Sequence, residues 1–90
     1  MAQAIVDPLE LRRFAAQLKK FQTEVQERLS SLHSQMLSLG DTWRDQEHEK
    51  FVREFEQTML ALRHFVEVTE EHVPFLLRKA ERIEEYLHQR

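Results

Sequence analysis

Three observations predict an all-α fold, an antiparallel hairpin of two long helices, for this 90-residue chain. The only glycine, Gly40, lies near the middle of the sequence. The two prolines, Pro8 and Pro74, leave long stretches uninterrupted. On both sides of Gly40, apolar residues recur every three or four positions, which is the spacing of amphipathic helices. We therefore expect one helical domain over residues 1–90, with helices at about 8–39 and 43–88 and a turn at about 40–42.

The first helix is expected to begin at Asp7 and Pro8. Aspartate is a good N-cap, proline suits the first helical position, and Glu10 stands where a capping-box acid belongs. The apolar residues that follow are spaced by three or four and predict one buried stripe. Part of this stripe also repeats every eleven residues, a period that favours nearly straight packing. The predicted stripe consists of Leu11, Phe14, Leu18, Phe21, Val25, Leu29, Leu32, Met36 and Leu39.

The break between the helices is expected at Gly40, because glycine tolerates the left-handed backbone that commonly ends a helix. Asp41 or Thr42 is then the predicted cap of the second helix. Asp45, with two further acids soon after it, places negative charge where the helix dipole favours it.

The second helix shows an unbroken alternation of three and four, which is a heptad seam. Its members are Val52, Phe55, Met59, Leu62, Val66, Thr69, Val73, Leu76, Ala80, Ile83 and Leu87. Further apolar residues flank the seam on both sides, more than a lone hairpin covers. We expect four of them, Phe51, Phe65, Val68 and Phe75, to form an interface with another chain.

The C-terminal arm, residues 75–90, is predicted to need a partner. Folding back from the turn places residue 74 opposite residue 8, so the first helix would stop covering the second near Pro74. A proline inside a helix loses one backbone hydrogen bond and commonly produces a kink. The apolar stripe nevertheless continues beyond it, at Leu76, Ala80, Ile83 and Leu87, with Tyr86 beside it.

Composition and motifs exclude several function classes. The chain has no cysteine and a net charge of −3, which disfavours thiol chemistry and nucleic acid as the main partner. No apolar run reaches the roughly 18 residues of a membrane span. Glu85 and His88 have the spacing of a metal-ligand pair in a helical bundle, but their neighbours are apolar. We therefore expect no metal, no cofactor, no enzymatic activity and no nucleic-acid partner, although the first helix carries a small basic cluster of the kind with which a hairpin dimer can read RNA, namely Arg12, Arg13, Lys19 and Lys20.

Trp43, just after the glycine, supports two interpretations. Its ring either closes the end of the hairpin or forms a partly exposed recognition residue at the tip. Because tryptophan is large, both can hold together.

The turn sequence Leu39-Gly40-Asp41-Thr42-Trp43-Arg44-Asp45, in the middle of a helical chain of this length, resembles that of the WxG family of small type VII secretion substrates, the ESAT-like proteins. The resemblance implies a helical hairpin that pairs with itself or a second WxG-type hairpin into a four-helix bundle. It also implies contact with a type VII secretion ATPase. Two features depart from the family pattern. Asp45 replaces the motif's glycine, and Arg90 stands where the C-terminal export signal that begins at tyrosine, here Tyr86, requires an acid.

Two functions follow as hypotheses. In the first, the protein is a non-enzymatic type VII-like export substrate. The N-terminus lacks the pattern of a Sec signal, so export would use a non-Sec route from the cytoplasm. In the second, it is an intracellular coiled-coil adaptor or scaffold subunit. Both need the same apolar seams, so the residues leave both open, together with homodimer or heterodimer and effector or chaperone.

Overall fold

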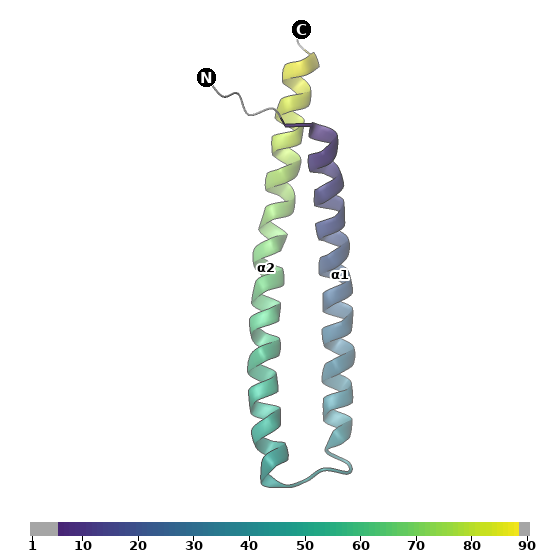
Figure 1. Cartoon of the computed structure of the whole chain (residues 1–90), viewed down its shortest axis with the longest axis vertical. Helices are drawn as coiled ribbons and strands as arrows, with labels where there is room; N and C mark the ends of the chain where they lie inside the picture. The colour runs from purple at the N-terminus through teal and green to yellow at the C-terminus, as the bar shows by residue number, and fades with distance from the viewer. Residues whose placement is uncertain (1–5, 89–90) are drawn as a thin grey trace.

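The computed structural model describes residues 6–88, and these form two long helices with no strand among them. Helix α1 spans Pro8–Leu39 and helix α2 spans Gln46–His88. Figure 1 shows them side by side and antiparallel, joined at one end by residues 40–45. The molecule is a rod with extents of 69 × 24 × 14 Å. Its thinnest dimension is close to the diameter of one helix, so the fold is a single layer of two helices. Residues 1–5, which begin the N-terminal segment that lacks the pattern of a Sec signal, lie outside the described residues. Arg90, at the acid position of the export signal, also lies outside them.

Helix α1 begins as its sequence predicts. Asp7 has an extended backbone, and its Oδ1 accepts a hydrogen bond of 2.9 Å from the amide of Leu9. Pro8 occupies the first turn, where its missing N–H costs nothing because that donor would have no helical partner. The local sequence alone therefore fixes where α1 starts.

The connection differs from the predicted turn, because α2 begins at Gln46 rather than near residue 43. The cap of α2 is Asp45, not Asp41 or Thr42, since Oδ1 of Asp45 accepts a 2.9 Å bond from the amide of His48. Gly40 is also not left-handed, as its φ of −60° and ψ of −18° are right-handed helical values. Successive turn bonds continue beyond α1, such as that from the amide of Trp43 to the carbonyl of Leu39 at 2.8 Å. These bonds satisfy the last carbonyls of α1 without a left-handed residue.

The buried residues of α1 recur every seven positions, whereas those of α2 have a mixed spacing. In α1 the buried residues are Ala15, Gln22, Leu29 and Met36, and in α2 they are Met59, Val66, Thr69 and Ala80. The eleven-residue pattern predicted for α1 is therefore not the packing period. Four members of the predicted stripe lie largely exposed instead: Phe14, Phe21, Leu32 and Leu39. The difference arises in α1, where the small Ala15 and the polar Gln22 lie in the seam, whereas the predicted stripe contained only large apolar residues.

The alignment of the two helices shows that α1 lies against more of α2 than predicted. Arg12 forms an ion pair with Glu84, and Gln22 donates a 2.9 Å hydrogen bond to Thr69. Residue 8 therefore lies near residue 83, not opposite residue 74. Ala80, placed by the prediction in an uncovered arm, is fully buried. The cause is the longer connection, which shifts α2 by several residues along α1.

Pro74 lies inside α2, and the helix continues through it to His88. The proline side chain is exposed, so its ring does not disturb the seam. Within residues 6–88, neither helix has a stretch apolar enough to cross a membrane.

Candidate functional site

The connection is organised around Trp43, whose ring is half-buried. The ring lies 4.9 Å from that of His48 and 5.7 Å from that of Phe51, measured between centroids. Phe51 in turn stacks on Phe55 at 5.5 Å. The tryptophan therefore packs on the first turns of α2 and begins a row of aromatic rings along that helix. The ring therefore packs at the tip while part of it remains accessible, and a recognition role for Trp43 stays a prediction.

Gly40 has a steric role at this tip. A Cβ atom at position 40 would lie 3.2 Å from the carbonyl oxygen of Leu37 and 3.7 Å from Cε1 of His48. The distance to the carbonyl oxygen is tighter than usual, whereas that to the imidazole is an ordinary van der Waals contact, so the glycine relieves crowding at the end of α1. Nε2 of His48 is buried without a hydrogen-bond partner in the described part of the chain. His48 serves here as a packing surface between the glycine and the tryptophan.

Asp45 occupies the place of the glycine in the W-x-G pattern and caps α2. Aspartate is among the best N-cap residues, and glycine is also tolerated at this position. The backbone at Asp45 does not need a positive φ, because no described non-glycine residue has one. The replacement therefore preserves the start of the second helix and adds a negative charge at its positive end.

The hairpin has two long faces of different character. The apolar face comprises exposed residues on one side of the seam: Phe14, Phe21, Leu32 and Leu39 of α1, with Phe51, Leu62, Phe65, Val68 and Phe75 of α2. Phe21 and Phe65 contact each other edge to face at 6.4 Å, which shows that these sides of the two helices meet. Phe65 is 52% exposed and Phe75 55% exposed. A run of exposed phenylalanines along both helices is typical of a surface that binds a partner.

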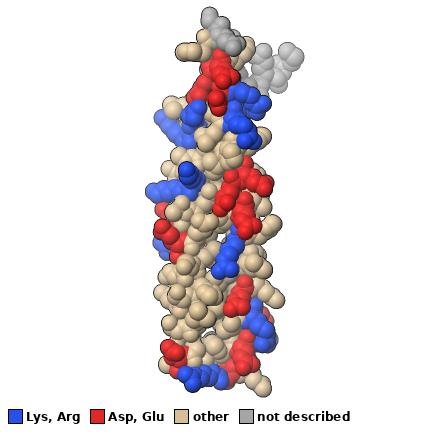
Figure 2. Space-filling model, turned by 180° about the vertical axis from the view of Figure 1, so that it is seen from behind, with Lys and Arg blue, Asp and Glu red and all other residues tan. Residues whose placement is uncertain are grey.

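The opposite side, the charged face, is defined by Arg12, Gln26 and His33 of α1 and Glu56, Arg63, Glu70 and Glu84 of α2. Gln26 donates to a carboxylate oxygen of Glu70 at 3.3 Å. Arg12 holds Glu84 through two hydrogen bonds of 2.6 and 2.8 Å. These bonds lower the pKa of Glu84 and raise that of Arg12. Figure 2 shows acidic and basic side chains following one another along the rod, with a broad uncharged area in the half that ends at the connection.

The C-terminal end of α2 extends past α1, as Figure 1 shows. Of the four residues predicted for the arm, Leu76 and Ile83 are half-buried, so the prediction that α1 leaves them uncovered is wrong. Tyr86 and Leu87 are 63% and 51% exposed. The uncovered part of the arm is thus shorter than predicted and consists of about the last turn of α2.

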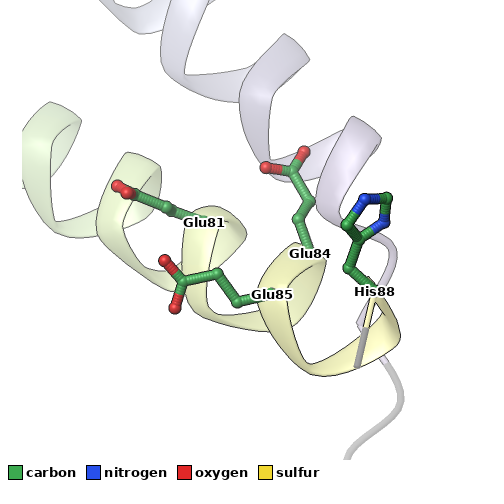
Figure 3. Close-up of a pocket in the computed structure, with 4 residues that line it drawn as sticks. All are labelled: Glu81, Glu84, Glu85 and His88. Carbon is green, nitrogen blue, oxygen red and sulfur yellow. The ribbon is translucent and has the colours of Figure 1, made fainter. Parts of the chain in front are cut away.

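A shallow hollow of about 570 Å³ lies beside this last turn, lined by Glu81, Glu84, Glu85 and His88. In Figure 3, Glu84 and His88 extend toward α1, whereas Glu81 and Glu85 point to the other side. In the described chain, no three such side chains are arranged to hold a metal ion. We therefore assign no ligand to this hollow.

The four residues predicted for an interface, Phe51, Phe65, Val68 and Phe75, all lie exposed on the apolar face. Their counterparts on α1 were missed, because the sequence reading assigned Phe14, Phe21, Leu32 and Leu39 to the seam. His48 was also missed as the neighbour of Trp43. One sequence pattern could have located the seam of α1, namely the seven-residue spacing of Ala15, Gln22, Leu29 and Met36. With these residues in the seam, the phenylalanines of α1 lie beside it.

Comparisons with known proteins agree with this architecture. The family model WXG100, described as proteins of 100 residues with WXG, matches residues 3–86. The crystal structure of the selenomethionine-labelled secreted protein EsxB from Bacillus anthracis strain Sterne superposes with a TM-score of 0.80. It is 28% identical over 96% of this chain and 98% of EsxB. The wild-type protein, crystallised in space group P21, gives a TM-score of 0.82 at 28% identity, covering 94% of this chain and 99% of EsxB. No curated protein gives a significant match.

The resemblance noted at the turn therefore extends over nearly the whole chain. A central Trp43, two antiparallel helices and a family match over most of the residues lead to one assignment. This protein belongs to the WXG100 family of small helical hairpins that resemble type VII secretion substrates.

Proposed function

We propose that this protein is a type VII secretion substrate that leaves the cytoplasm by a non-Sec route, as one member of a pair of hairpins without enzymatic activity. The observation that carries the proposal is the family match over residues 3–86. The secreted EsxB protein shares the fold at 28% identity over nearly its whole length, which supports export as the common role. Over residues 6–88, the surface offers a long apolar face and only open hollows, an arrangement that favours binding over catalysis.

Pairing through the apolar face follows from its exposed aromatic area. Each buried phenylalanine contributes roughly 1.5–3 kcal/mol relative to an exposed one. A standard protein interface covers about 800 Å² per partner, roughly a tenth of the 7677 Å² surface of this hairpin. A second hairpin, either another copy or a different WxG-type chain, would cover this face and complete a four-helix bundle.

The last turn of α2 is the proposed contact for a type VII secretion ATPase. Tyr86 and Leu87 present exposed apolar surface at the open end of the hairpin, away from the connection. Leu76 and Ile83 are half-buried near the seam and would position this turn rather than contact the ATPase themselves.

An export assay in the host tests the proposal. Tagged protein is measured in the medium of a parent strain and a strain that lacks the type VII ATPase. We expect secretion only from the parent strain. Tyr86→Ala is expected to reduce secretion several-fold without loss of helicity, whereas Leu60→Ala, which is as exposed as Tyr86, serves as the matched control. Equal secretion from both strains would reject the proposal, and retention in the cytoplasm of both strains would favour the adaptor function.

A further inference from the structure

We propose that Arg12 is the positioning residue for the C-terminal end of α2, because its side chain reaches across from α1 and keeps residues 81–88 helical. This inference rests on the proposed function, in which the last turn of α2 is the contact for the ATPase. It is carried by the ion pair between Arg12 and Glu84 and by the charges that surround this pair.

The Arg12–Glu84 pair joins two distant parts of the chain. Nε of Arg12 donates a 2.8 Å hydrogen bond to one carboxylate oxygen of Glu84, and Nη2 donates one of 2.6 Å to the other. Two such bonds fix the guanidinium and the carboxylate in one geometry. The residues are 72 positions apart, so the pair ties the second turn of α1 to the last two turns of α2.

The end of α2 carries acids where they weaken a helix. Glu84 and Glu85 follow Glu81 by three and four residues, a spacing that brings like charges close together on one helix. All three acids also lie in the last turns, where the negative end of the helix dipole disfavours carboxylates. The end of α2 is therefore destabilised by its own side chains and gains from a cation supplied by another element.

The basic residues of α2 itself do not supply that cation. Within residues 6–88 none of them forms an ion pair with these acids. A cation that precedes an acid on a helix is also the weaker order for such a pair. In this part of α2 the basic residues are Arg78, Lys79 and Arg82.

Arg12 acts on more than one of the acids. The hydrogen bonds and the charge of Glu84, and then the charge of Glu81, raise the pKa of Arg12. Figure 3 shows Glu84 extending toward α1, whereas Glu81 and Glu85 point to the other side. Glu84 is thus the acid that bonds α1 directly, and the guanidinium also offsets part of the repulsion from its neighbour Glu81.

Apolar packing contributes less beyond this point. Ala80 is fully buried and Ile83 half-buried, but Tyr86 and Leu87 are 63% and 51% exposed. The last turn therefore gains little stability from burial in the seam. Its helical state, and with it the arrangement in which its side chains meet the ATPase, depends on the pair that Arg12 forms.

Solution NMR of the purified protein tests this dependence, because amide exchange reports local opening residue by residue. Arg12→Gln should speed exchange of the amides of residues 84–88 about 2–5-fold, the size expected for an ion pair between partly exposed side chains. Exchange at residues 55–70 should stay as in the native chain. Arg13→Gln is the matched control, since Arg13 is the adjacent cation of α1 and forms no ion pair within the described chain.

A charge exchange shows whether the pair itself is responsible. Arg12→Glu should speed exchange at residues 84–88 more than Arg12→Gln, because it adds a further acid beside the cluster. Adding Glu84→Arg to Arg12→Glu should restore slow exchange, since the pair re-forms with its charges reversed. In about 0.5 M NaCl the difference between the native chain and Arg12→Gln should shrink, as salt screens partly exposed charges.

The repulsion among the acids has a test of its own. In the Arg12→Gln background, Glu81→Gln together with Glu85→Gln should return the exchange of residues 84–88 close to that of the native chain. With fewer like charges in the last turns, the helix needs less help from α1.

Secretion from the host strain tests whether export uses the ordered end of α2. Arg12→Gln should lower the amount of tagged protein in the medium several-fold, and Arg13→Gln should leave it unchanged. The charge exchange, which re-forms the pair, should restore secretion together with slow amide exchange.

The outcomes separate this inference from the proposed function. Native exchange at residues 84–88 in Arg12→Gln would overturn the inference, and so would a charge exchange that fails to restore slow exchange. Faster exchange with unchanged secretion would overturn the positioning role of Arg12. Equal secretion of the native chain with and without the ATPase would reject the proposed function, whereas the NMR result for the end of α2 would still stand.

Discussion

The apolar face and the charged face run along the same two helices, yet the sequence uses them differently. On the charged face, side chains of the two helices bond each other, as Arg12 does with Glu84 and Gln26 with Glu70. On the apolar face, phenylalanines remain half-exposed although Phe21 and Phe65 touch. The charged face is therefore bonded within the chain, whereas the apolar face leaves its phenylalanines exposed and is the surface we propose for a partner.

The seam between the faces explains this difference. Its buried side chains are half small or polar (Ala15, Gln22, Thr69 and Ala80) and half aliphatic or methionine (Leu29, Met36, Met59 and Val66). None of these buried residues is aromatic. Most of the aromatic area therefore lies outside the seam, on the apolar face. An aromatic row beside a seam that contains no aromatic residue indicates a surface for association.

The largest expected loss of stability distinguishes the seam from the exposed surface of the same helix. Leu29→Ala empties a buried position and should destabilise the fold by about 2–5 kcal/mol. Leu37→Ala, on an exposed position of the same helix, should cost under about 0.5 kcal/mol. Urea unfolding monitored by circular dichroism measures both variants. If the two losses were equal, the seam would not be the main source of stability within the chain.

An intermediate effect is expected at the polar layer of the seam. Thr69→Val leaves the amide of Gln22 buried without its acceptor and should cost about 1–3 kcal/mol. Replacing both partners, with Gln22→Leu and Thr69→Val together, should recover most of that loss. A double-mutant cycle in urea gives the coupling between them. Additive losses would show that the hydrogen bond does not matter to the seam.

The smallest effect is expected on the charged face and depends on pH. The bonds from Arg12 hold the pKa of Glu84 below its ordinary value. The contribution of this pair is therefore complete above about pH 4.3, the usual pKa of a free glutamate, and is lost as the pH falls through the lowered value. Thermal unfolding from pH 7 to pH 3 should show a steeper loss for the native chain than for Glu84→Gln. Glu85→Gln is the control, and an identical slope for Glu84→Gln would contradict the role of the pair.

The start of α1 could be predicted from sequence because Asp7 and Pro8 act within one turn. The family could be predicted from the central Trp43, because the motif is local. The register could not be predicted in this way. It depends on the length of the connection and on which side chains fit between the helices, and a shift of a few residues moved Ala80 from the expected open arm to the most buried position.

The same limit applies to the candidate site. The exposure of Phe65 and Phe75 could be predicted, because the alternation of three and four identified the α2 seam and both residues lie beside it. On α1, the spacing of large apolar residues suggested one stripe, although the true seam included Ala15 and Gln22. Hydrophobic size alone does not distinguish the side of a helix that packs within the chain from the side that packs against another chain.

The 69 × 24 × 14 Å rod has a hydrodynamic consequence. A single hairpin this thin experiences more friction for its mass than a sphere and should elute early from a sizing column. A second hairpin lying along the apolar face would thicken the rod while scarcely lengthening it. Association would then double the mass with only a modest change in diffusion coefficient, so elution volume alone would underestimate the change and sedimentation would reveal it.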